Sequence, residues 1–235
     1  MNKILQGIRK ELKENIDIEY KKGAINYFRE KIKIYGVRTP IVRKISKKYF
    51  NKIKHQEKSE IFSLCEKLLK TGYGEEAGVA FDWAFRLYKQ YEKKDFEIFE
   101  SWLEKYISDW GKCDSFSTRA FGYFIYVFPE FLPKVKLWTK SKNRWLRRSS
   151  AVILIYSARR KKYLKDVFKT ADILLLDSDD MVQKGYGWML KEASNVYSKE
   201  IFNYVMKNKN KMPRTALRYA IEKYPQKLRK KAMKK

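Results

Sequence analysis

Residues 60–62 read Glu-Ile-Phe, and this order of one acidic and two apolar residues returns at even intervals along most of the chain. The copies begin 33 to 37 residues apart: Glu60-Ile61-Phe62, Glu97-Ile98-Phe99, Glu130-Phe131-Leu132, Asp166-Val167-Phe168 and Glu200-Ile201-Phe202. In several copies a lysine-rich turn precedes the triplet, as at residues 91–95 and 160–163. Since five near-even copies fit coincidence poorly, we infer that one structural unit repeats.

Each repeat is predicted to be a pair of helices. Apolar residues recur every three to four positions, and only 5 prolines and 10 glycines interrupt the chain, which favours helices over strands. We expect helices near residues 2–14, 17–33, 40–53, 57–70, 75–91, 95–107, 113–127, 130–140, 144–157, 161–175, 179–195, 198–208 and 213–223. Helix pairs with this period are typical of HEAT-like solenoids. The sequence therefore predicts an all-α, HEAT-like helical-repeat solenoid, a curved α-α superhelix with a basic concave face.

The charge of the chain points to a polyanionic partner. It has 54 Lys and Arg against 27 Asp and Glu, a formal net charge of +27. Biased codon usage would explain many lysines, but acidic residues serve solvated positions equally well, so it leaves the imbalance unexplained. Neutralisation of phosphates is the leading physical reason for such an excess. With 44% hydrophobic residues, the chain can also bury a core, which excludes a disordered basic tail.

Other chemistries find little support. Cys65 and Cys113 lack metal-ligand spacing, and the single histidine, His55, lies in a polar stretch, so neither a zinc site nor a His-dependent nucleophile is expected. No apolar run approaches the roughly 18 residues of a membrane span, and residues 1–14 lack the apolar region of a signal peptide. No linker divides the chain, and we expect one domain over residues 1–235 without metal or cofactor.

One predicted helix carries an aromatic residue away from its apolar side. On a helical wheel Trp188 projects between Lys184 and Lys191. It is either a second packing face or an aromatic plate beside phosphate-binding lysines. Gly185 and Gly187 in the same helix indicate either close approach by a ligand backbone or a crowded helix–helix contact, and both interpretations stay open.

Two further clusters combine polar and aromatic residues. Asp114 or Ser115 is more simply explained as a cap of the helix predicted to end at 127 than as a catalytic group. Arg148 lies at the edge of a predicted core side, where its guanidinium would reach a phosphate or pair with a carboxylate. Asn143 is predicted to be the N-cap of that helix.

Together these blocks resemble the AlkD-type DNA alkylation repair family, HEAT-like DNA glycosylases that act on alkylated purines. The resemblance spans nearly the whole chain. It rests on Tyr27 with residues 36–43 (Gly-Val-Arg-Thr-Pro-Ile-Val-Arg), Trp110 through Asp114-Ser115, residues 145–148 (Trp-Leu-Arg-Arg) and residues 183–188 (Gln-Lys-Gly-Tyr-Gly-Trp). Gly111-Lys112 after Trp110 departs from the acidic or polar residue that relatives often carry there.

The resemblance implies roles for individual residues. Trp110, Asp114 and Trp188 correspond to residues that line the catalytic cleft of the family, and Arg148 corresponds to an arginine that contacts the DNA backbone. The further DNA contacts that we expect are Tyr27, Arg38, Thr39, Pro40, Arg43, Lys184 and Lys191.

The implied reaction is hydrolysis of an N-glycosidic bond in duplex DNA. A purine such as 3-methyladenine or 7-methylguanine carries positive charge, so its bond to the sugar is already weak. A fixed carboxylate would stabilise the charge that develops on the deoxyribose, and Asp114 is the candidate. The same carboxylate would position water, while Trp110 and Trp188 line the cleft. We expect a base-excision repair hydrolase that acts as a monomer, without an obligate protein partner, in the cytoplasm and on the nucleoid of a prokaryote.

A non-catalytic HEAT-like solenoid that binds DNA or structured RNA through its basic face is the main alternative. It accounts for the charge, the period and the exposed aromatics without any chemistry. A protein scaffold ranks third, and a failure to bind any nucleic acid, whatever the salt concentration, would favour it.

Overall fold

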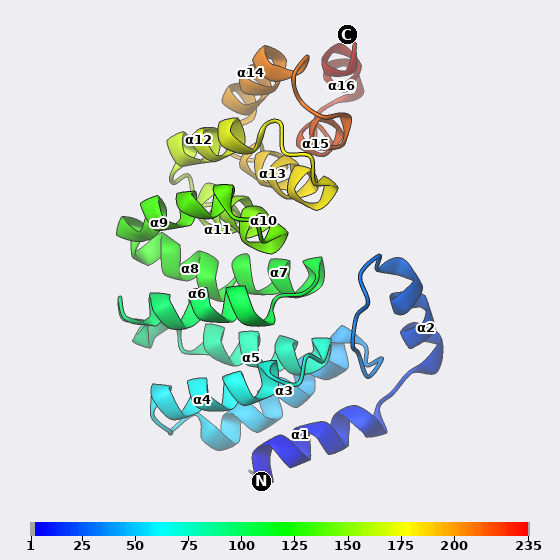
Figure 1. The fold of residues 1–235 in the computed structure, drawn as a ribbon, viewed down its shortest axis with the longest axis vertical. Coiled ribbons are helices and arrows are strands. Elements are labelled where there is room, and N and C mark those ends of the chain that lie inside the picture. Colours follow the sequence, from blue (N-terminus) through cyan, green and yellow to red (C-terminus); the bar gives the residue numbers. More distant parts are fainter. Residues whose placement is uncertain (1–2, 235) are drawn as a thin grey trace. The chain divides into compact units, whose positions relative to one another are not determined.

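The computed structural model describes residues 3–234, and the regular elements in this range are helices without any strand (Figure 1). The prediction of an all-α, helical-repeat fold is confirmed, whereas the curvature and the basic concave face stay predictions. The chain divides into two compact units, one ending at Phe116 and the other beginning at Ser117. That residues 1–235 act as a single domain also stays a prediction.

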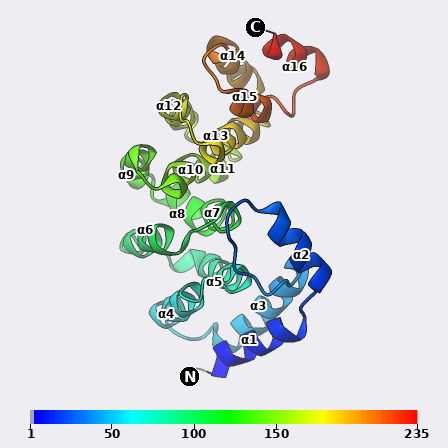
Figure 2. The same ribbon diagram turned by 45° about the vertical axis from the view of Figure 1, so that its right-hand side comes forward.

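The first unit has an aromatic core. Its elements are α1 (Lys3–Glu14), α2 (Ile18–Tyr27), α3 (Thr39–Ile53), α4 (Lys58–Leu69), α5 (Gly74–Arg86), the 3-10 turn η1 (Tyr88–Gln90), α6 (Asp95–Tyr106) and α7 (Trp110–Ser117), which ends on the first residue of the second unit. Helices α4 and α5 lie side by side (Figure 2), and α3 also packs against α5. The side chains that fill the core are Trp83, Phe96, Phe99, Trp102 and Phe116, each at most 2% exposed.

The second unit is organised around α13. Its elements are α8 (Ala120–Val127), η2 (Pro129–Phe131), α9 (Leu132–Leu137), η3 (Trp138–Lys140), α10 (Arg144–Val152), α11 (Leu154–Ala158), α12 (Leu164–Leu174), α13 (Asp180–Ala193), α14 (Ser198–Asn208), α15 (Arg214–Ala220) and α16 (Gln226–Met233). Helix α13 packs against α10, α12 and, most extensively, α15. Tyr186 of α13 is fully buried, and its hydroxyl donates to the Leu175 carbonyl at 3.1 Å.

Each copy of the acidic triplet stands at the start of a helix. A carboxylate in a first turn is favoured there because it faces the positive end of the helix dipole. The five acids lie in the first turns of α4 (Glu60), α6 (Glu97), η2 directly before α9 (Glu130), α12 (Asp166) and α14 (Glu200). The repeat found in the sequence therefore marks the first helix of each pair.

The predicted helix 17–33 is wrong beyond Tyr27. From Phe28 the backbone is extended, with φ −85° and ψ 137°, and residues 28–38 form an irregular segment. Within it Lys31 and Lys33 are exposed while Ile32 and Ile34 are half-buried, an alternation with a period of two that is typical of extended chain rather than helix.

Other helix predictions also need correction, and the helix expected over 144–157 is two helices, α10 and α11. The helix expected over 113–127 is two helices, α7 and α8, because the chain turns at residues 118–119. Gly122 permits the close packing there, since a Cβ on it would lie 2.5 Å from the Ser117 carbonyl oxygen. Helix α16 was not predicted, because only Ala232 of its side chains is fully buried and one short stretch with Leu228, Ala232 and Met233 gives a weak apolar pattern.

Gly185 and Gly187 are explained by helix packing. A Cβ on Gly187 would lie 2.8 Å from the Ala216 carbonyl oxygen and 2.8 Å from the Tyr219 Cβ, and one on Gly185 would lie 3.0 Å from the Arg148 Cγ. Of the two interpretations that the sequence left open, the crowded helix–helix contact therefore holds within the second unit.

Both cysteines, Cys65 and Cys113, are buried free thiols. Among residues 3–234 no cluster of His, Cys, Asp and Glu could hold a metal ion. Within the same range no helix combines the length and the apolar character needed to cross a bilayer.

We expect Gly187→Ala to lower the free energy of unfolding by about 1–3 kcal/mol, because the added methyl overpacks the contact between α13 and α15. Gly23→Ala in α2 is the matched control, since no heavy atom lies within 4 Å of the position that its Cβ would take. The control should be stabilised by roughly 0.5–1 kcal/mol. Urea unfolding of both variants measures the difference, and a similar response from the two would show that the contact at Gly187 is not tight.

Candidate nucleic-acid interface

The N-terminus of α7 presents an ordered group of aromatic rings. The indole of Trp110, the first residue of α7, stacks on Phe28 with ring centroids 4.6 Å apart and planes 7° apart. Tyr27 packs edge-on to the same indole at 5.9 Å and is 75% exposed. Two segments distant in the sequence, the end of α2 and the start of α7, therefore join in one aromatic surface.

Asp114 lies on the same side of α7 as Trp110, because residues four apart are neighbours on a helix surface. It is half-buried and is the fifth residue of the helix, so its interpretation as a cap is wrong. Asp109 is the residue that fills this role: its carboxylate accepts from the backbone N–H of Lys112 at 2.9 Å and pairs with the Lys112 ammonium at 3.1 Å.

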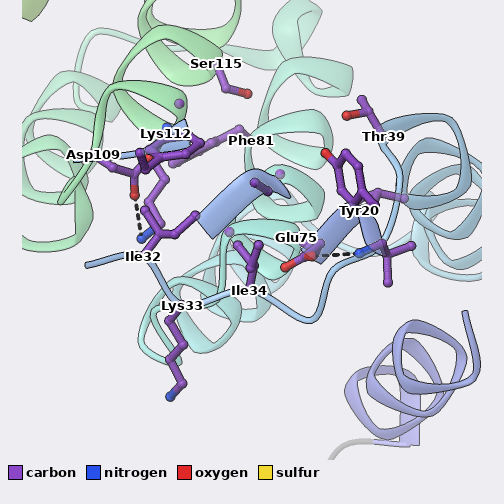
Figure 3. A pocket seen from close by; sticks show the side chains of 17 residues that line it. Tyr20, Ile32, Lys33, Ile34, Thr39, Glu75, Phe81, Asp109, Lys112 and Ser115 are labelled. Atoms are coloured by element: carbon purple, nitrogen blue, oxygen red, sulfur yellow. Dashed lines mark hydrogen bonds and ion pairs between the residues drawn. The ribbon is translucent and has the colours of Figure 1, made fainter. Parts of the chain in front are cut away.

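A pocket of about 330 Å³ lies beside this helix (Figure 3). Figure 3 shows Asp109 and Lys112 on one side of it and Tyr20 and Thr39 on the other, with Ile32 and Ile34 between them. The lining residues, mostly apolar, come from α2, the 28–38 segment, the start of α3, the first two turns of α5, and α7 with the residue before it: Tyr20, Ala24, Phe28, Ile32, Lys33, Ile34, Val37, Thr39, Val42, Gly74, Glu75, Gly78, Phe81, Asp109, Gly111, Lys112 and Ser115.

Glu75 holds the irregular segment in place at this pocket. Its carboxylate accepts three backbone N–H groups, from Tyr35 at 3.0 Å, Gly36 at 2.7 Å and Val37 at 3.0 Å. Gly36 has φ +97°, which favours glycine. Since these N–H groups lack helical partners, the buried carboxylate supplies the bonds that they need. Neither Glu75 nor Phe28 was among the residues predicted from the sequence.

The start of α3 follows directly and is open to solvent. Thr39, Pro40 and Arg43 are exposed. Arg38 pairs with Asp17 at 2.8 Å, and its guanidinium lies 5.2 Å from the centre of the Tyr20 ring. The pKa of Asp17 is lowered by the backbone hydrogen bond from Tyr20 and by Arg38. An exposed helix start with nearby arginines is suited to bind an anion.

In the second unit, Trp188 is held by a polar network. Its indole Nε1 donates to Glu192 at 3.3 Å. Glu192 is 6% exposed and pairs with Arg159 at 2.9 Å and with Lys223 at 3.2 Å. The indole is half-buried, so both a packing role and a free aromatic face are compatible with its position.

The remaining basic candidates lie on α10 and α13. Arg148 is 5% exposed and donates to the Met181 carbonyl at 2.5 Å, so in this structure it links the two helices. Lys184 pairs with Asp180 at 3.1 Å, and Lys191 pairs with Glu222 at 3.0 Å. The proposed DNA contacts of these residues stay predictions.

The residues predicted from the sequence thus fall into two groups, one in each unit. In the first unit Tyr27 and Trp110 are in contact, and Asp114 follows Trp110 on α7. The predicted residues at the start of α3 form the exposed helix end, while α10 and α13 carry those of the second unit. Phe28 could have been found from the sequence, because it directly follows the predicted contact residue Tyr27.

This fold defines a helical-repeat protein. The chain belongs to the family of DNA alkylation repair enzymes, whose model matches residues 8–224, and the resemblance inferred from the sequence blocks is confirmed. It is similar in structure to a predicted DNA alkylation repair enzyme from Enterococcus faecalis, with a TM-score of 0.79 and 17% identity over 90% of this chain and 98% of that chain. At this identity the likeness shows the fold alone. No curated protein matches the chain.

We expect acid to weaken the network around Trp188. Burial alone would raise the pKa of Glu192, but hydrogen bonds and charge from Arg159 and Lys223 outweigh it and lower the pKa below the ordinary 4.5. A carboxyl with a lowered pKa stabilises the fold above its unfolded-state value, and this contribution disappears as the pH falls through the folded-state pKa.

Glu192→Gln should therefore be less stable than the wild type at neutral pH, and the difference should shrink below about pH 4.5. Urea unfolding across this pH range tests the expectation, with Glu104→Gln, an exposed carboxylate of α6, as the control. A stability difference that does not change with pH would show that the charge of Glu192 is not what stabilises the network.

Proposed function

We propose that this protein is a DNA glycosylase that excises positively charged alkylated purines, of the 3-methyladenine and 7-methylguanine type, from duplex DNA. The observation that carries the proposal is the arrangement on α7, where the Asp114 carboxylate follows one turn after a Trp110 indole that is stacked on Phe28. Membership of the DNA alkylation repair family is the reason for proposing DNA as the substrate.

The carboxylate acts on the sugar. An alkylated purine is already a good leaving group, because its departure neutralises the charge on the base. The main energetic cost is the positive charge that develops on the deoxyribose, and a fixed anion stabilises this charge more in the transition state than in the ground state. Asp114 also orients the water that attacks the anomeric carbon. The C–N bond breaks with its electron pair going to the base, and water supplies the oxygen of the new C–O bond and loses a proton.

The aromatic residues bind the lesion strand. A cationic base is attracted to an indole face, and the stack on Phe28 fixes the orientation of Trp110 before DNA binds. Tyr27, which is largely exposed, adds a second contact, and Trp188 supplies a further indole whose Nε1 is held by Glu192. The chemistry uses water alone and needs no cofactor.

Basic residues and a helix start bind the backbone. The exposed start of α3, with Arg38, Thr39, Pro40 and Arg43, is suited to a phosphate because two arginines lie at the positive end of the helix dipole. In the second unit the proposed contacts are Arg148, Lys184 and Lys191. We further propose that the protein acts as a monomer on double-stranded DNA in the cytoplasm.

We expect Asp114→Asn to slow the release of methylated base by about 10²–10³-fold, because one fixed charge in the transition state is removed. The affinity for duplex DNA should stay close to that of the wild type. Free base and heat-labile abasic sites in methylated DNA measure the reaction. Glu104→Gln, which removes one carboxylate charge from an exposed position of α6, is the matched control and should retain most of the activity.

Undiminished release of base by Asp114→Asn would remove this carboxylate from the mechanism. If the wild-type protein binds duplex DNA but releases no base, the alternative function, a non-catalytic DNA-binding solenoid, is favoured over the glycosylase.

We expect Arg148→Gln to weaken duplex binding. If Arg148 neutralises one phosphate, the substitution should also reduce the slope of log affinity against log salt concentration by about 0.9. The substitution also removes the hydrogen bond to the Met181 carbonyl, so the stability of the variant is measured in parallel. The neighbouring Arg147→Gln, which removes an ion pair with Asp177, is the control. A variant of Arg148 that is less stable but keeps the wild-type slope would show that this arginine only joins α10 to α13.

A further inference from the structure

A basic groove runs between α15 and α16 in the second unit. It has a volume of about 660 Å³ and none of the residues predicted from the sequence lies in it. The residues that line it are Arg214, Thr215, Arg218, Tyr219, Ile221, Glu222, Gln226, Arg229, Lys230 and Met233.

The cations of this groove have no carboxylate partners. Arg218, Arg229 and Lys230 are exposed, and no hydrogen bond or ion pair joins their side chains to another described residue. The guanidinium of Arg214 donates to the Met233 carbonyl at 3.1 Å, which leaves its charge uncompensated. The one acidic residue of the lining, Glu222, is bound by Lys191 at 3.0 Å.

Three arginines elsewhere in the same unit pair with carboxylates. The guanidinium of Arg144 contacts Asp179 at 2.8 Å, that of Arg147 contacts Asp177 at 2.7 Å, and that of Arg159 contacts Glu192 at 2.9 Å. Residues 209–234, by contrast, hold ten lysines and arginines and one acidic residue. Like charges gathered in this way repel one another and destabilise the fold, so the groove is suited to a ligand that brings many negative charges.

The groove is continuous with α13. The Lys191 ammonium, which pairs with Glu222, also lies 5.9 Å from the centre of the Tyr219 ring, and both partners line the groove. A ligand on α13 near Lys191 is therefore next to Arg218 and its neighbours. Guanidinium groups match the geometry of phosphate oxygens, and cations on two helices can follow successive phosphates of a nucleic-acid backbone.

We propose that the groove between α15 and α16 binds the sugar-phosphate backbone of duplex DNA and extends the contact beyond α13. The inference rests on the proposed function for the choice of DNA as the ligand. The family model ends at residue 224, before α16 begins, so one wall of the groove lies outside the pattern that defines the family.

The test compares two triple variants of the full-length chain. Arg218→Gln, Arg229→Gln and Lys230→Gln are combined in the groove variant. The control combines Lys165→Gln, Lys199→Gln and Lys207→Gln, which remove the same charge from exposed positions on α12 and α14. Affinity for an unmodified duplex is measured over a range of salt concentrations, and thermal unfolding checks that both variants fold. Because all six side chains are exposed, both variants should remain folded. If the groove variant is nevertheless less stable, the single variant Arg229→Gln takes its place in the binding measurement.

The groove variant should bind more weakly, with its salt slope reduced by roughly 0.9 for each phosphate that the groove no longer neutralises, while the control stays close to the wild type. Equal reductions in the two variants would overturn the proposal, because they would reflect net charge alone. Wild-type affinity for the duplex in the groove variant would also overturn it.

Base excision at saturating protein separates this inference from the proposed function. The groove variant keeps Trp110, Asp114 and Trp188, so its single-turnover rate should equal that of the wild type. If the wild type excises no base but the groove variant still binds the duplex more weakly, the proposed glycosylase function is wrong while the DNA-binding role of the groove is supported.

Discussion

The structure depends on the burial of one side of each helix pair against its neighbours. A single amphipathic pair leaves its apolar side in water, so pairs are stable only when stacked. In the first unit this contact is made by aromatic rings, with Phe116 of α7 stacked on Phe81 of α5 at 4.7 Å. In the second unit buried rings such as Phe121 and Phe124 are joined by close backbone approach, where Gly187 lets α13 pack closely on α15. The candidate functional residues project from helices that this packing already holds.

Features that depend on local pattern could be predicted from the sequence. The acidic triplet marks helix starts because its carboxylate interacts with the helix dipole and its two apolar residues begin the apolar side of the same helix. Asn143 was expected to be an N-cap, and its side chain does accept from the Trp145 N–H at 2.9 Å. Trp110 and Asp114 were paired by the family resemblance alone, because the helix expected over 113–127 left Trp110 outside it, whereas α7 carries both residues.

Features that depend on contacts between distant segments could not be predicted from the sequence. The segment 28–38 is irregular because Glu75 binds its N–H groups and Phe28 stacks on Trp110, and neither contact leaves a mark in the local sequence beyond the alternation of lysine and isoleucine. The sequence favours a cap at Asp114 because the helix was expected to start at residue 113, whereas α7 starts at Trp110 and Asp109 caps it. Helix α16 was missed for a related reason, since Ala232 is its only fully buried side chain among the described residues.

The burial of the two thiols bears on the environment in which a DNA alkylation repair protein works. Methylating agents react with thiolates, and the reactivity of a cysteine follows its exposure and its pKa. Cys65 and Cys113 are each 0% exposed, and burial raises the pKa of the Cys65 thiol well above its ordinary value. The chain therefore shields its softest nucleophiles from the electrophiles whose damage its family repairs.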